Sequence, residues 1–154
     1  MSVFRTLEKG LDWGLHDAGL DGLSVDYVAA ELVLVLRIKF GRHQETERRA
    51  RVVVTGLVWA IIEPPCLDEN GDLNDCDMRI DLVDGGLVAE PSMPLPKVPE
   101  GAFGQSIYVA DWNAFIHVVG RHARLEWLEP EPTATDPQSQ VLFPGEAIDG
   151  PAED

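Results

Sequence analysis

The sequence lacks the long apolar segments of membrane and secreted proteins. Its longest apolar stretch without a charge, residues 52–62, has 11 residues, whereas crossing a bilayer takes about 20. The N-terminal MSVFRTLEKG has no apolar core after its basic residue, so no secretory signal is visible. We therefore expect a cytoplasmic protein with no membrane partner.

Cysteine is scarce, with Cys66 and Cys76 alone in the chain. In a reducing cytoplasm both are expected to remain thiols. If they did pair, closing so short a loop would stabilise the fold by about 2.5 kcal/mol. They do not form a CxxC motif, so the spacing does not indicate zinc.

Motifs of nucleophilic and nucleotide chemistry are also absent. The serines do not occur in GxSxG, and neither GxxxxGK[ST] nor GxGxxG is found. We assign no catalytic residue, no metal ligand and no cofactor from sequence, although the question of enzymatic activity stays open.

Basic charge is low: 12 Lys and Arg stand against 27 Asp and Glu, a net charge of −15. Seven acids lie in residues 129–154 and eight in residues 63–84, where Arg79 is the one basic residue. Nucleic acid is disfavoured as a partner, because binding it needs a basic surface. The concentrated negative charge instead favours a partner protein with a basic surface.

The hydrophobic pattern predicts one α+β domain over residues 1–128: an N-terminal helix packed on an antiparallel sheet of about six or seven strands. Phe4, Leu7 and Leu11 share one helical face, and Gly10 or Gly14 would end that helix. Alternating or continuous apolar residues predict the strands, and these lie at residues 23–27, 32–40, 51–62, 78–82, 107–110, 115–119 and 123–128. Gly56 would mark a bulge.

A two-residue turn at Gly120 and Arg121 would join the last two strands in a hairpin. In that register His117, Arg124 and Glu126 occupy a solvated polar face. Residues 129–154, with five prolines and no basic residue, have the composition of a disordered acidic tail.

The candidate binding residues form several small groups. His16 and Asp17 are a pair used for metal binding and general-base chemistry, but adjacent side chains meet at one atom only if the backbone bends there. Residues 68–72 begin like a calcium loop, although Leu73 and Arg79 occupy positions that need glycine and glutamate. Trp112 is a candidate surface anchor for a partner. The full set is His16, Asp17, Asp68, Asp72, Asp75, Asp77, Trp112, His117 and Arg124.

The segment LHDAGLDGLSVDYVAAELVLVLRI, residues 15–38, resembles the start of small, mostly uncharacterised bacterial domains with a Leu-His-Asp-Ala element. Some of these are immunity proteins of bacterial toxin systems. The resemblance implies an intracellular α+β domain that binds another protein and performs no chemistry. The leading hypothesis is therefore a protein-binding module, an immunity-type inhibitor of a basic partner. The alternatives are a metal-dependent hydrolase using His16 and Asp17, with His117 as a further candidate, and a structural protein that forms oligomers such as a homodimer.

Overall fold

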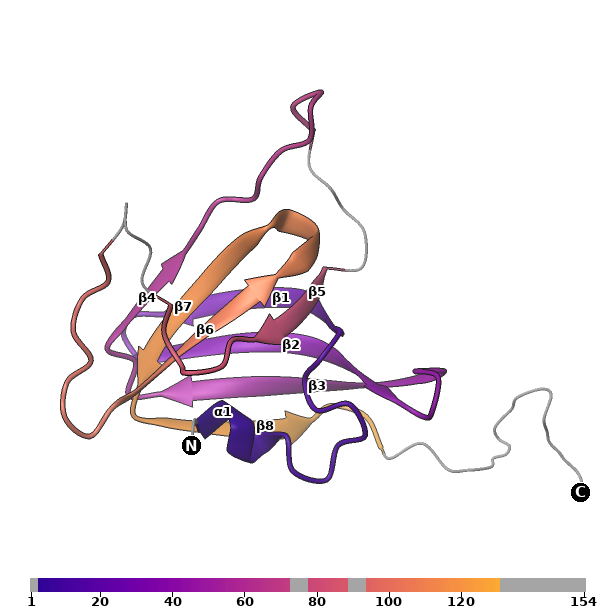
Figure 1. Ribbon diagram of the computed structural model, residues 1–154. Coiled ribbons are helices and arrows are strands. Elements are labelled where there is room, and N and C mark those ends of the chain that lie inside the picture. Colours follow the sequence, from indigo (N-terminus) through magenta and orange to yellow (C-terminus); the bar gives the residue numbers. More distant parts are fainter. Residues whose placement is uncertain (1–2, 73–77, 89–93, 131–154) are drawn as a thin grey trace, which may run out of the picture.

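The computed structural model describes residues 3–72, 78–88 and 94–130. In these residues one short helix accompanies a single sheet of eight strands, paired in the order β4-β7-β6-β5-β1-β2-β3-β8 (Figure 1). All its pairings are antiparallel, which confirms the expected fold class with one strand more than the upper expected number. The elements are α1 (Val3–Leu7), β1 (Ala18–Asp26), β2 (Glu31–Phe40), β3 (Thr46–Thr55), β4 (Trp59–Ile62), β5 (Arg79–Leu82), β6 (Phe103–Val109), the 3-10 turn η1 (Ala110–Trp112), β7 (Ala114–Gly120) and β8 (His122–Trp127).

The core follows the alternation expected of strands. In β2 the residues Leu32, Leu34, Leu36 and Ile38 are buried, and the residues between them face outward. Side chains from both ends of the strand order complete the same cluster, which includes Val52, Val54, Ile80, Ile107, Ile116 and Val118. Each fully buried Leu, Ile or Val contributes roughly 1.5–3 kcal/mol, so this shared interior is what holds the sheet in its curled form.

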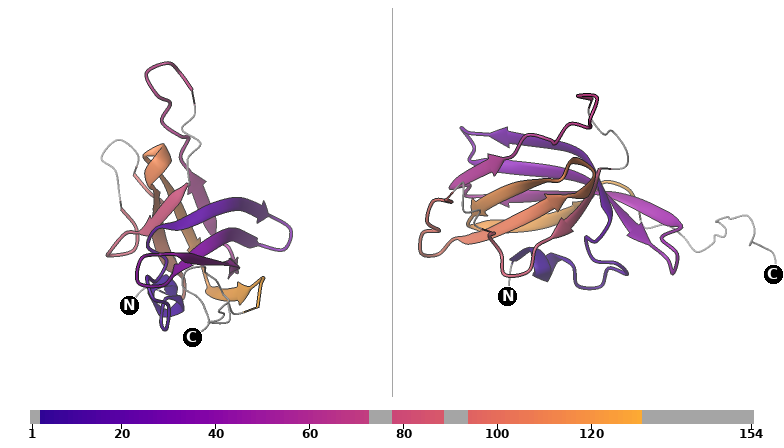
Figure 2. Two further views of the ribbon diagram at one scale, coloured as in Figure 1. Left: turned by 90° about the vertical axis from the view of Figure 1, so that its right-hand side faces the viewer. Right: turned by 45° about the horizontal axis from the view of Figure 1, so that its top comes forward.

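The sheet curls until its two ends are joined through the chain. Strand β3 continues into β4, and β7 continues into β8, so each end of the strand order is covalently linked to the other. The β3–β8 pairing ends at Thr55 and His122, and the β4–β7 pairing begins at Trp59 and Val119. Two hydrogen bonds lie between these pairs, from Arg121 N to Thr55 O (3.0 Å) and from Val58 N to Val119 O (2.8 Å). Figures 1 and 2 show β6 and β7 crossing over β1, β2 and β3 as a result.

Two glycines permit this crossing. Gly56 has a φ of 62°, and a Cβ added at Gly120 would lie 2.4 Å from Val54 Cγ1. The sequence predicts a bulge at Gly56 within one strand over residues 51–62, but the chain instead breaks there into β3 and β4, which accounts for the additional strand. The expected Gly120–Arg121 hairpin is wrong: β7 pairs with β6 and β4, whereas β8 pairs with β3. A glycine suited to a tight turn is equally suited to a bend in a continuous strand.

Other local differences concern element ends. The helix stops at Leu7, before Gly10 and Gly14, and its Phe4 is fully buried. Strand β1 ends at Asp26, whose carboxylate accepts hydrogen bonds from two amides of the following turn, so Tyr27 is 87% exposed and does not extend the strand. In the described residues no helix has the length and hydropathy needed to span a bilayer. The predicted acidic tail lies outside the described residues from residue 131 onward.

Candidate functional site

His16 and Asp17 lie at the corner between α1 and β1, where the backbone bends sharply. Asp17 has a φ of 60°, in the left-handed region that residues other than glycine seldom adopt. Its amide donates a 3.0 Å hydrogen bond to Ile80 O, which attaches the corner to β5. The bend brings the two adjacent side chains together, with His16 Nε2 3.4 Å from Asp17 Oδ2.

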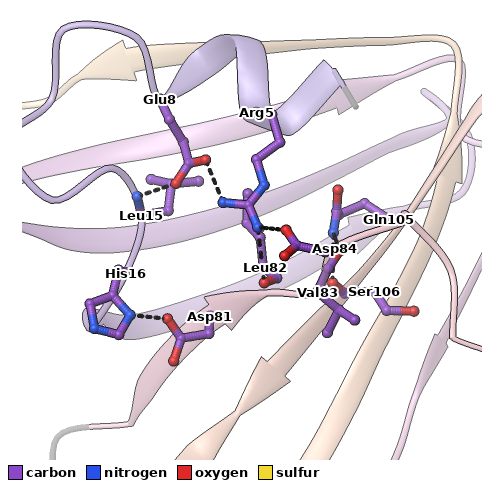
Figure 3. Close-up of polar contacts among 10 residues, drawn as sticks. All are labelled: Arg5, Glu8, Leu15, His16, Asp81, Leu82, Val83, Asp84, Gln105 and Ser106. Atoms are coloured by element: carbon purple, nitrogen blue, oxygen red, sulfur yellow. Dashed lines mark hydrogen bonds and ion pairs between the residues drawn. The ribbon is translucent and has the colours of Figure 1, made fainter. Parts of the chain in front are cut away.

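Asp81 of β5 completes this cluster. Its Oδ1 contacts His16 Nδ1 (Figure 3). With Asp17 near Nε2, the imidazole lies between two carboxylates. The hydrogen bond to Asp81 raises the pKa of His16 above its ordinary value. Desolvation opposes this increase, and the negative charges of Asp81, Asp17 and Glu8 add to it. The His16 side chain remains 54% exposed, so it is accessible to protons and to solutes.

Polar contacts around the corner hold these side chains in place. Glu8 accepts a 2.7 Å hydrogen bond from Leu15 N and pairs with Arg5 at 2.9 Å, and Arg5 in turn pairs with Asp84 beyond β5 (Figure 3). Gln44 Nε2 donates to Asp17 Oδ2 at 3.3 Å. The corner is therefore braced from the helix, from β5 and from the β2–β3 connection.

Sequence reasoning missed Asp81 as a site residue. The alternation of Met78, Ile80 and Leu82 predicts that Asp81 faces away from the core, but nothing local signals a partner 65 positions earlier in the chain. In the part of the chain that the structure describes, His16, Asp17 and Asp81 form the one group of three potential metal ligands, with one ligand atom of each within 4.8 Å of the others.

His117, expected on a solvated face, is fully buried. Its side chain points away from the core, which contains Ile116 and Val118. However, it lies opposite Ser106 on β6 and contacts Glu63, the residue that follows β4. His117 Nδ1 is 2.7 Å from Ser106 Oγ, and Nε2 is 3.2 Å from Glu63 Oε2. A neutral ring protonated on Nε2 satisfies both contacts, since it accepts from Ser106 and donates to Glu63.

This Ser-His-Glu arrangement superficially resembles an activated nucleophile, but its surroundings oppose that role. Ser106 is fully buried, and its Oγ accepts a 2.9 Å hydrogen bond from Val88 N. Glu63 also accepts from Phe115 N at 2.9 Å. A substrate would have to displace these contacts to reach the hydroxyl, so the arrangement joins β4, β6 and β7 as a structural element.

The structure does not bring His16 and His117 into one site: they contact different side chains, on different strands. Arg124 is separate from both, since it is half-exposed and pairs with Glu126. Trp112 is half-buried and lines an apolar pocket of about 370 Å³, together with Leu20, Leu23, Met78 and Phe115. The carboxylate-bearing residues Asp21 and Glu63 also line this pocket.

The acidic region, residues 63–84, is less uniform than its composition indicates. Asp81 faces His16 and Asp84 pairs with Arg5, so much of the negative charge at β5 has a partner. Asp68, Glu69 and Asp72 lie on an exposed loop. The Asp68 carboxylate accepts hydrogen bonds from the amides of Asn70 and Asp72 within the loop. Asp75, Asp77 and Cys76 lie outside the described residues, and Cys66 is an exposed free thiol.

Searches of protein-family models, curated proteins and solved structures found no match to this chain.

Proposed function

We propose that this chain is a non-catalytic protein-binding module whose partner has a basic surface, as an immunity-type inhibitor of a cationic toxin would require. The observation that carries the proposal is the loop at residues 66–72, which extends away from the sheet (Figure 1). Asp68, Glu69 and Asp72 are exposed there beside Leu67, which is 55% exposed. Negative charge around an apolar anchor suits a cationic protein surface.

Backbone hydrogen bonds restrict the conformation of the loop. Cys66 N donates to Trp112 O at 2.9 Å, and Asp68 N donates to Asp72 O at 2.8 Å. Gly71, at a φ of 83°, allows the turn between them, where its amide bonds to Asp68 O. Because these contacts already restrict the backbone, binding loses less conformational entropy than it would for a loose loop.

The apolar pocket begins where this loop leaves the sheet. Ile62 and Glu63 line the pocket, and Pro64 and Pro65 connect them to the loop. A partner segment with an apolar side chain next to lysine or arginine therefore has two matched contacts: the pocket for the apolar group and the carboxylates for the cation.

A selection from a displayed library of random peptides tests the proposal. Peptides enriched on the immobilised chain should combine lysine or arginine with an aliphatic or aromatic residue. The double variant Glu69→Gln/Asp72→Asn should slow their association roughly tenfold at low salt. Those two carboxylates are chosen because Asp68 maintains the loop itself.

The matched control is Glu31→Gln/Glu100→Gln, which removes the same charge outside the loop. It should slow association less than the loop variant does, because the attraction between two charges weakens with distance and with screening. Enrichment of acidic or uncharged peptides, or equal loss of binding in both double variants, would overturn the proposal.

A further inference from the structure

The His16 corner has the composition of a metal site as well as that of an ion pair. One imidazole and two carboxylates converge from the corner and from β5, with a ligand atom of each within 4.8 Å of the others. We propose that His16, Asp17 and Asp81 together bind one zinc ion. This inference does not depend on the proposed protein partner.

The ligands are held by backbone contacts that exist before any ion binds. The amide of Asp17 bonds to Ile80 O, and Ala18 and Gly19 pair with Ile80 and Arg79 in the sheet. Asp81 directly follows Ile80, the residue to which the corner is hydrogen-bonded. The three side chains need to rotate rather than refold, because zinc bonds of about 2.0–2.2 Å to nitrogen and oxygen place ligand atoms roughly 3.3 Å apart.

The donor set favours a transition metal over calcium or magnesium. Calcium and magnesium select oxygen ligands, whereas an imidazole nitrogen suits zinc and its neighbours in the periodic table. Gln44 donates to the Asp17 carboxylate at 3.3 Å, in the manner of the outer hydrogen bonds that orient metal ligands. Three protein ligands at a half-exposed site leave a coordination position for water.

The exposed histidines and the thiols provide the controls. His43 and His122 are exposed and lie outside the cluster, so they report adventitious binding by surface imidazoles. Cys66 is an exposed thiol, so the experiment uses the full chain with both cysteines replaced by serine. Circular dichroism melting of each variant verifies that it is folded.

Isothermal titration of the EDTA-treated protein with zinc chloride tests the site. We expect one zinc per chain, with affinity reduced at least tenfold in His16→Ala and in Asp81→Asn, and unchanged in His122→Ala and His43→Ala. Cobalt(II) titrated in place of zinc should give visible absorption that disappears in the same two variants. The Cys-free background ensures that this absorption comes from nitrogen and oxygen ligands.

Two results would overturn the inference. The first is the absence of zinc binding to the folded Cys-free chain at submillimolar concentration. The second is binding that His16→Ala and Asp81→Asn leave intact, since the ion would then occupy other groups. Either result would also remove the basis for a metal-dependent hydrolase at His16 and Asp17, while the peptide selection would still decide the protein-binding function.

Discussion

Two histidines of this molecule lie between oxygen-bearing side chains, and burial separates their roles. His117 lies between Ser106 and Glu63 with its side chain fully buried, whereas His16 lies between Asp81 and Asp17 with its side chain 54% exposed. Contacts of a buried polar group have no water to replace them, so losing one is costly. Contacts of an exposed group exchange readily with water, protons or ions. The buried cluster around His117 therefore has a structural role, and the exposed cluster around His16 is available for binding.

The largest effect should come from removing the buried ring. His117→Leu removes the contacts of the imidazole with the Ser106 hydroxyl and the Glu63 carboxylate. We therefore expect a loss of about 3 kcal/mol in the free energy of unfolding. His16→Leu, the matched change at the exposed cluster, should cost less than about 1 kcal/mol. Urea unfolding measures the free energy of unfolding of both variants. Equal losses would contradict the conclusion that the buried cluster is structural and the exposed cluster is not.

A smaller effect is expected from Ser106→Ala. This change removes the acceptor for the Val88 amide and the donor to His117 Nδ1, which should destabilise the fold by roughly 2 kcal/mol. Asp81→Asn removes one partner of the exposed ring and should cost less than about 1 kcal/mol. The same urea measurements serve here, and a neutral Ser106→Ala variant would mean that water replaces the hydroxyl.

The exposed cluster should make stability depend on pH. The folded-state pKa of His16 is raised above its ordinary value of 6.5, so the stabilisation is fully present below that value and is lost as pH rises through the raised pKa. We expect the stability advantage of the wild type over His16→Gln to shrink as the pH rises above about 6.5. Thermal unfolding of both proteins in EDTA-containing buffer at a series of pH values measures this difference in stability. A difference that does not change with pH would argue against the ion pairs of His16.

The sequence predicts local structure better than it predicts these clusters. The alternation in β2 identifies the buried face because its signal repeats within ten residues. His117 also alternates with Ile116 and Val118 as expected, but its side-chain partners Ser106 and Glu63 come from other segments of the chain. Gly120 permits either a hairpin turn or a bend, and the pairing of β8 with β3 instead of β7 shows which one forms. Long-range pairing therefore decides both the closure of the sheet and the identity of the exposed cluster.

The smallest effect distinguishes the two carboxylates around His16. The hydrogen bond that Asp81 accepts from His16 is the main cause of the raised pKa of His16, and Asp17 acts through charge alone at 3.4 Å. Asp81→Asn should therefore lower the pKa of His16 more than Asp17→Asn does. NMR titration of the histidine ring protons in metal-free buffer resolves each residue. A larger decrease of the His16 pKa in Asp17→Asn would mean that Asp17, at the strained corner, is the principal partner of the imidazole. The backbone bend that positions Asp17 would then favour protonation of His16 more than the contact with Asp81 of β5 does.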